Sequence, residues 1–230
     1  MIKNIFLDLD NTILDFHKAE RIAVCKTFDK LNIPYTDETI ARYGKINVAR
    51  WKGLERGELT LKQVQYGRFE QLFDEIGVSV SAEETQDLYH RLLSEEHDFM
   101  PGGKGLLDEL KNSGKYRLFM ATNGSPDVQH PRIADSGIGE YFENIFISYE
   151  MGCAKPQKEF FDKCFAHIEG FNRDEAIIVG DSLTSDIMGG INAGIHTCHY
   201  NVWGDKYDKI IPEYTITNLS ELIPLLESIK

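Results

Sequence analysis

The chain has 230 residues, of which 42% are hydrophobic and 27% charged, a composition typical of a soluble globular protein with a sizeable core. It holds 25 Lys and Arg against 37 Asp and Glu, so the formal net charge is −12. So acidic a surface repels polyanions, which argues against a nucleic-acid polymer as a partner. A site for a small phosphorylated molecule would therefore need a local positive charge of its own.

The N-terminal segment and the cysteines indicate where the protein works. The apolar run in MIKNIFLDLDNT is too short for a signal peptide, and no stretch of the sequence approaches the length of a transmembrane helix. The four cysteines, at positions 25, 153, 164 and 198, form no CxxC pair. We therefore expect reduced thiols in a soluble, cytoplasmic protein that does not act at a membrane.

Short apolar runs without alternation recur along the chain. They lie at residues 5–7, 117–121, 145–148, 176–179, 196–200 and, more weakly, 214–217. Uninterrupted apolarity indicates strands that are buried on both faces. Helical patterns follow, with Leu106, Leu107 and Leu110 on one face and similar faces at 160–165 and 219–226. Strands that alternate with helices predict an α/β fold with a doubly wound parallel sheet.

Residues 15 to 100 break this alternation, because they contain no convincing strand. Amphipathic helical patterns appear at 21–31, 61–76 and 83–96, with a turn-rich middle from Trp51 to Gly57. The turn signal Met100-Pro101-Gly102-Gly103 closes the segment. We expect an inserted helical cap at 15–100 and an α/β core formed by 1–14 and 101–230.

Polar residues follow four of the predicted strands, at the edge where an open parallel sheet binds its ligands. They are Asp8 to Thr12 after the first strand, Thr122, Asn123 and Gly124 after the second, Lys155 after the third, and Asp181, Ser182 and Asp186 after the fourth. Each motif alone also occurs in solvated loops and turns, but four of them in order at strand ends favour one shared site. Pro156 fits the first position of the next helix.

This set of residue types suits phosphoryl transfer. Asp8 and Asp181 can offer the carboxylate oxygens that Mg²⁺ prefers, and the ion would keep Asp8 ionised and nucleophilic. Asp10 can protonate a leaving oxygen and later activate water. Thr122 can hold phosphate oxygens, and Lys155 supplies the missing positive charge.

With these motifs the chain resembles the haloacid-dehalogenase-like superfamily of phosphohydrolases over essentially its whole length. The resemblance implies that Asp8 is the nucleophile, and that Asp10 is the general acid/base and lends its backbone carbonyl to Mg²⁺. It further implies that Asp181 binds the metal and that Asp186 is a direct or outer ligand. The sequence does not specify whether Mg²⁺, Mn²⁺ or Co²⁺ is the preferred metal. Thr122, Asn123, Gly124 and Lys155 correspond to the motifs that bind the phosphate.

More finely, Gly189 to Gly194 and the pair Gln129 and Arg132 are similar to a pyrimidine 5′-nucleotidase branch of the superfamily. Pro131 departs from that branch, in which an ordinary helical residue is expected. The resemblance implies a 5′-nucleotidase that acts on a small nucleoside monophosphate. Aromatic candidates for contact with the leaving group are Phe16, His17, Trp51 and Tyr66 in the cap, and Trp203 in the core.

Other activities remain open at this point. Asp10 argues against a dehalogenase, which lacks the second aspartate and the metal, and a phosphonatase would need a Schiff-base lysine in the cap. A sugar-phosphate phosphatase or a phosphomutase would keep the same motifs. A non-enzymatic phospho-acceptor also pairs an aspartate with Mg²⁺ and a lysine, although the long insert and Asp10 count against it. The sequence does not specify the oligomeric state.

Overall fold

The computed structural model describes residues 1–229 and contains one six-stranded sheet. The strands are β1 (Asn4–Leu7), β2 (Arg117–Thr122), β3 (Asn144–Ile147), β4 (Ala176–Gly180), β5 (His196–Tyr200) and β6 (Tyr214–Ile216). Their order is β3-β2-β1-β4-β5-β6, and every neighbouring pair is parallel. All six runs predicted from continuous apolarity are strands, and the predicted α/β fold class is confirmed.

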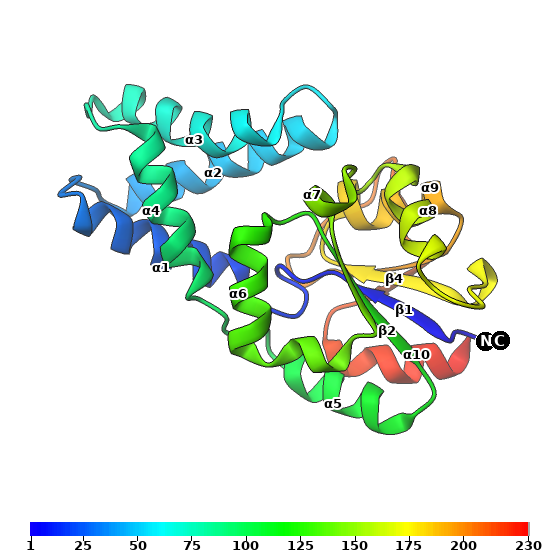
Figure 1. Cartoon of the computed structure of the whole chain (residues 1–230). Coiled ribbons are helices and arrows are strands. Elements are labelled where there is room, and N and C mark those ends of the chain that lie inside the picture. Colours follow the sequence, from blue (N-terminus) through cyan, green and yellow to red (C-terminus); the bar gives the residue numbers. More distant parts are fainter. Residues whose placement is uncertain (230) are drawn as a thin grey trace.

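Alternate residues of the strands face two different apolar layers. Ile5 and Leu7 of β1 belong to a cluster with the leucines of α5 (Gly103–Ser113) and α10 (Leu222–Ser228). Phe6 faces the other layer, with Phe160 and Phe161 of α8 (Lys158–Ala166). Helices therefore cover both faces of the sheet (Figure 1), and burial on both sides explains why the strands carry no polar alternation.

The remaining helices of the core are short. They are α6 (Pro126–Ser136), α7 (Ser148–Met151) and α9 (Met188–Ala193), with single 3₁₀ turns at Ile138–Tyr141, Arg173–Glu175 and Leu219–Glu221 and a π-helical turn at Leu183–Ile187. Close packing explains two glycines in α9. A Cβ at Gly189 would lie 2.7 Å from Phe161, and one at Gly190 would collide with Ile178 of the sheet.

Four helices lie between β1 and α5 in the chain and pack mainly on one another. They are α1 (Phe16–Lys30), α2 (Asp37–Glu55), α3 (Leu61–Ile76) and α4 (Ala82–Ser94), and they lie together beside the core (Figure 1). Their apolar faces form one hydrophobic cluster, which Val128 of α6 joins. We call α1 to α4 the cap helices. The turn-rich middle expected from Trp51 to Gly57 is wrong for Trp51–Glu55, which continue α2.

The two connections between the cap helices and the sheet run side by side. Asp15 donates its backbone N–H to Asp98 O (2.8 Å), and Met100 donates to Ile13 O (2.9 Å). The division at residues 14/15 and 100/101 stays a prediction. Within residues 1–229, none of the helices combines the length and apolarity needed to cross a membrane.

Candidate active site

Strand order and register bring the predicted residues to one edge of the sheet. The order of the strands reverses between β1 and β4, the place where doubly wound sheets bind ligands. Leu7 pairs with Val179 and with Met120, so Asp8, Asp181 and Thr122 emerge beside one another. The backbone N–H of Asp8 donates to Val179 O at 3.0 Å, which fixes the start of the first loop.

Lys155 is the positive charge of this edge. Its side chain is 1% exposed, and Nζ donates to Asp8 Oδ1 (2.7 Å), Asp186 Oδ1 (2.6 Å) and the backbone oxygen of Ala121 (2.5 Å). Burial by itself lowers the pKa of Lys155, but the charges of Asp186 and Asp8 outweigh it and raise the pKa. The lysine therefore stays charged between the two carboxylates.

Asn123 positions Lys155 from the neighbouring strand end. Asn123 Nδ2 donates to Lys155 O at 2.8 Å, and Lys155 N donates to Asn123 Oδ1 at 3.0 Å. The peptide bond between Lys155 and Pro156 is cis. The expectation that Pro156 begins a helix is wrong, because α8 starts at Lys158 after an extended Gln157.

Three carboxylates form the candidate metal centre. Ligand oxygens of Asp8, Asp181 and Asp186 all lie within 4.8 Å of one another. Burial raises the pKa of Asp8 to about 7, and burial together with the charges of Asp8 and Asp186 raises the pKa of Asp181 well above its usual value. One lysine does not balance three carboxylates. A hard divalent cation with oxygen ligands fits this donor set.

The carboxylates of Asp186 and Asp181 differ in what they contact. Both oxygens of Asp186 are already engaged, Oδ1 by Lys155 and Oδ2 by the backbone N–H of Ser182 at 3.0 Å. A Cβ at Gly180 would collide with the Asp186 side chain, so Asp186 can lie this close to the strand end only because residue 180 is glycine. The carboxylate of Asp181 accepts no hydrogen bond from residues 1–229, which leaves it available to a cation.

Asp10 is held by two donors from α6. Arg132 Nη1 donates to Asp10 Oδ1 (2.5 Å) and Gln129 Nε2 donates to Asp10 Oδ2 (2.7 Å). Arg132 is fully buried, and its Nε donates to the backbone oxygen of Glu96 (2.8 Å), close to the second connection to the cap helices. The interior proline at 131 does not displace the helix, which begins at Pro126.

Thr122 is oriented by the same network. Its Oγ1 accepts the N–H of Gly124 (3.2 Å) and Nε2 of Gln129 (2.9 Å), which uses both lone pairs and leaves the hydroxyl hydrogen free to donate. A Cβ at Gly124 would collide with Gln129. The sequence therefore needs glycine at 124 for the glutamine to reach both Thr122 and Asp10.

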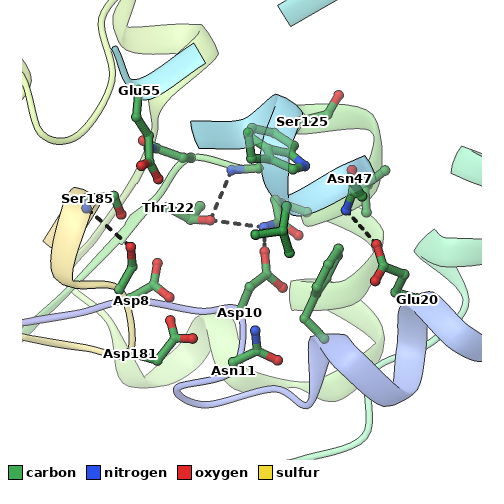
Figure 2. Close-up of a pocket in the computed structure, with 18 of the residues that line it drawn as sticks. Asp8, Asp10, Asn11, Glu20, Asn47, Glu55, Thr122, Ser125, Asp181 and Ser185 are labelled. Carbon is green, nitrogen blue, oxygen red and sulfur yellow. Dashed lines mark hydrogen bonds between the residues drawn. The ribbon is translucent and has the colours of Figure 1, made fainter. Parts of the chain in front are cut away.

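A cavity of about 250 Å³ opens over this edge and extends to the cap helices. In Figure 2, Asp8 and Asp181 lie toward one end of this cavity and Glu20 and Asn47 toward the other, with Thr122 between them. Of the aromatic candidates, Phe16, His17 and Trp51 line it. Tyr66 lines a different hollow, and Trp203 lies edge-on against His17 with ring centroids 4.9 Å apart.

Several lining residues were not predicted from the sequence as site residues. They are Glu20, Asn47, Arg68 and His90 of the cap helices, while Arg132 beside Asp10 was noted only for its likeness to one branch. A signal existed, because Glu20, Asn47 and Arg68 are polar residues on the apolar, buried faces of their helices. A buried charged residue needs a partner, so such positions are candidates for function.

Comparison with known proteins agrees with this geometry. The chain is 37% identical to the HAD-hydrolase YfnB of Bacillus subtilis over 225 residues (97% of this chain, 95% of YfnB). The crystal structure of YfnB bound to magnesium superposes with a TM-score of 0.93 and 98% coverage of each chain. The pyrimidine 5′-nucleotidases PynA of Streptococcus pneumoniae and YjjG of Escherichia coli are 32% and 31% identical, with at least 95% of every chain covered. The family model for haloacid dehalogenase-like hydrolases matches residues 2–194, and the chain belongs to that family.

Proposed function

We propose that the protein is a Mg²⁺-dependent phosphomonoesterase that works through an aspartyl-phosphate on Asp8 and acts on a nucleoside 5′-monophosphate. The observation that carries the proposal is the convergence of Asp8, Lys155, Thr122, Asp181 and the doubly held Asp10 on one end of the cavity. The identity to two pyrimidine 5′-nucleotidases supports the nucleotide as substrate.

Mg²⁺ would be held by Asp8, Asp181 and the backbone carbonyl of Asp10, with Asp186 as an outer partner because both of its oxygens are engaged. When bound, the ion would neutralise charge on the phosphate and keep the nearby carboxylates ionised. The magnesium-bound crystal structure of YfnB supports this choice of metal.

In the first half-reaction an oxygen of Asp8 attacks the phosphorus, and the bond from phosphorus to the leaving oxygen breaks. Asp10 gives its proton to that oxygen, so that an alcohol leaves. The free hydroxyl of Thr122 donates a hydrogen bond to a phosphoryl oxygen, and the nearby positive charge of Lys155 stabilises the negative charge that gathers on the phosphoryl oxygens in the transition state.

In the second half-reaction water attacks the phosphorus of the aspartyl-phosphate. Asp10, now ionised, takes a proton from that water as the bond between phosphorus and the Asp8 oxygen breaks, which releases phosphate. Arg132 and Gln129 keep the Asp10 carboxylate in one orientation for both steps. We also propose that residues 15–100 move as a unit to admit substrate, a view supported by the interdomain movement that the YfnB crystal structure reveals.

The test is phosphate release from nucleoside monophosphates and sugar phosphates, with Mg²⁺ and with EDTA. We expect release that needs Mg²⁺, is highest for pyrimidine monophosphates and disappears in Asp8→Asn. Asp174→Asn, which alters an exposed aspartate in a 3₁₀ turn, is the matched control and should keep activity. Undiminished release by Asp8→Asn would contradict the mechanism.

Other outcomes separate the alternatives. Preference for sugar phosphates would retain the phosphatase and discard the nucleotide. Stimulation by a bisphosphorylated sugar with little free phosphate would indicate a phosphomutase. A long-lived aspartyl-phosphate without turnover would indicate a phospho-acceptor.

A further inference from the structure

The end of the cavity opposite Asp8 carries polar side chains that the phosphoryl-transfer chemistry does not use. Glu20 of α1, Asn47 of α2 and Arg68 of α3 converge there from three different cap helices, and Figure 2 shows Asn47 beside Glu20. Glu20 is 8% exposed, and Asn47 and Arg68 are each 2% exposed. We call these three residues the cap triad. Buried polar groups are costly unless they are fully partnered, so what they contact bears on their purpose.

The hydrogen bonds of the cap triad leave capacity unused. Asn47 Nδ2 donates to Glu20 Oε1 (2.5 Å), and Arg68 Nη1 donates to Asn47 Oδ1 (2.9 Å). Arg68 also donates from Nε and Nη2 to Oε1 of Gln86. Arg68 therefore uses three of its five N–H groups, while Oε2 of Glu20 accepts no hydrogen bond from residues 1–229.

The pKa of Glu20 is consistent with a carboxyl that lacks some of its hydrogen-bond partners. Burial raises the pKa of its carboxyl to about 7, although Arg68 and the hydrogen bond from Asn47 oppose the rise. Glu20 and Arg68 make no ion pair with each other in the described residues. The cavity thus presents a carboxyl acceptor and spare guanidinium donors, held apart by an amide.

Ring systems line the same cavity as the cap triad. Phe16 and Trp51 line the same cavity, and so does His90, whose pKa is lowered to about 3 by burial and by the charge of Arg68. His90 therefore stays neutral and can still hydrogen-bond. A second phosphate group is an unfavourable occupant beside the Glu20 carboxyl, and a flexible aliphatic chain would leave the triad unsatisfied. A flat polar ring fits both the aromatic walls and the unused donors and acceptor.

We propose that the cap triad binds the leaving group through a planar lactam edge, an N–H flanked by C=O groups as on a uracil or thymine ring. Glu20 accepts the ring N–H, and Arg68 donates to a neighbouring carbonyl oxygen. The proposal rests on the proposed nucleotidase function and adds the residues that select the base. It makes Glu20, Asn47 and Arg68 specificity-determining residues rather than catalytic ones.

The first experiment needs no variant, so it does not depend on how substitutions fold. The kcat/KM of the wild-type protein is measured for UMP, for 3-methyl-UMP, whose ring N–H is replaced by N–CH₃, and for ribose 5-phosphate. The assay is run above pH ~7, where the Glu20 carboxyl is ionised, and loss of a hydrogen bond to this charged group by methylation should lower kcat/KM by about 10- to 100-fold. Equal values for UMP and 3-methyl-UMP would overturn the proposal.

The second experiment compares Glu20→Gln with Glu70→Gln, the same chemical change on the exposed side of α3. Glu20→Gln should lower kcat/KM for UMP by about 10-fold relative to ribose 5-phosphate, and it should shrink the difference between UMP and 3-methyl-UMP. Glu70→Gln should match the wild type. An equal loss on UMP and ribose 5-phosphate would mean that Glu20 only supports the fold, and that outcome overturns the assignment.

The two proposals fail differently. Release of no phosphate from any of the three compounds would remove the proposed function itself. Brisk release with no preference for UMP over ribose 5-phosphate would leave the phosphatase standing and remove only the base site.

Discussion

The buried carboxyl of Glu20 makes the stability of this protein depend on pH in a way that one substitution can isolate. Its pKa is raised from 4.5 to about 7, chiefly by desolvation. The folded state therefore binds this proton more tightly than the unfolded state. The resulting stabilisation is fully present below pH ~4.5 and is lost as pH rises through about 7.

The magnitude follows from the shift. Each pKa unit corresponds to about 1.4 kcal/mol, so the Glu20 contribution should fall by about 2.5 kcal/mol between pH ~5 and ~8. Glu20→Gln keeps the shape of the side chain and removes the proton. The free energy of unfolding of the wild type minus that of Glu20→Gln should therefore decrease by this amount over the interval, about 5–10 °C in Tm for a chain of this size.

The assay is urea unfolding of both proteins at several pH values, in EDTA so that no metal is bound. All other titrating groups are the same in both proteins, so their effects cancel in the difference. Glu70→Gln is the control, and its curve should follow the wild type within about 0.5 kcal/mol because the side chain is exposed. If the difference between wild type and Glu20→Gln does not change with pH, Glu20 is not a desolvated carboxyl, and the reasoning is refuted.

Three further predictions concern the core. Lys155→Met leaves buried carboxylates without their cation. The free energy of unfolding should fall by about 3–5 kcal/mol, which lowers the Tm by roughly 6–20 °C, and phosphate release should stop. A Tm within 2 °C of wild type, about 1 kcal/mol or less, would contradict this. Mg²⁺ at 100 times its Kd should raise the Tm of the wild type by about 5–11 °C, and an equal rise in Asp181→Asn would exclude that residue as a ligand. Gly190→Ala should lower the free energy of unfolding, measured by chemical denaturation, by about 1–3 kcal/mol because its Cβ meets the sheet. Gly44→Ala, with open space around the new Cβ, should raise it by about 0.5–1 kcal/mol. Equal effects of the two substitutions would refute the packing argument.

The strands were predictable from the sequence because their environment is simple. A strand buried on both faces must be apolar at every position, as Asn4–Leu7 and Ala176–Gly180 nearly are, so the pattern needs no knowledge of its neighbours. Helix α2 was not predicted from the sequence. One reason is that Gly44 and Gly53 weaken the intrinsic helix propensity of this segment. Its start is fixed by a reciprocal cap between Thr36 and Thr39, and its buried face by contact with the other cap helices.

The convergence of the candidate catalytic residues was also predictable, because each follows a strand and parallel strands end at one edge of the sheet. Which atoms they contact was not. Asp10 lies 122 residues from Arg132 in the chain, and nothing between them in the sequence indicates that the two side chains meet. The same holds for Lys155, whose one ammonium group contacts two carboxylates from different strand ends.

By itself the sequence determined the α/β fold, the run of helices between the first two strands and the residue types that gather at the carboxyl ends of the strands. Those features depend on apolar period and on position relative to each strand, which are local properties. Only the tertiary structure decided how the gathered residues are paired, and that polar side chains of three cap helices face the cavity. Pairing and burial depend on contacts between residues that are distant in the chain, and the packing of helices onto helices and onto the sheet creates those contacts.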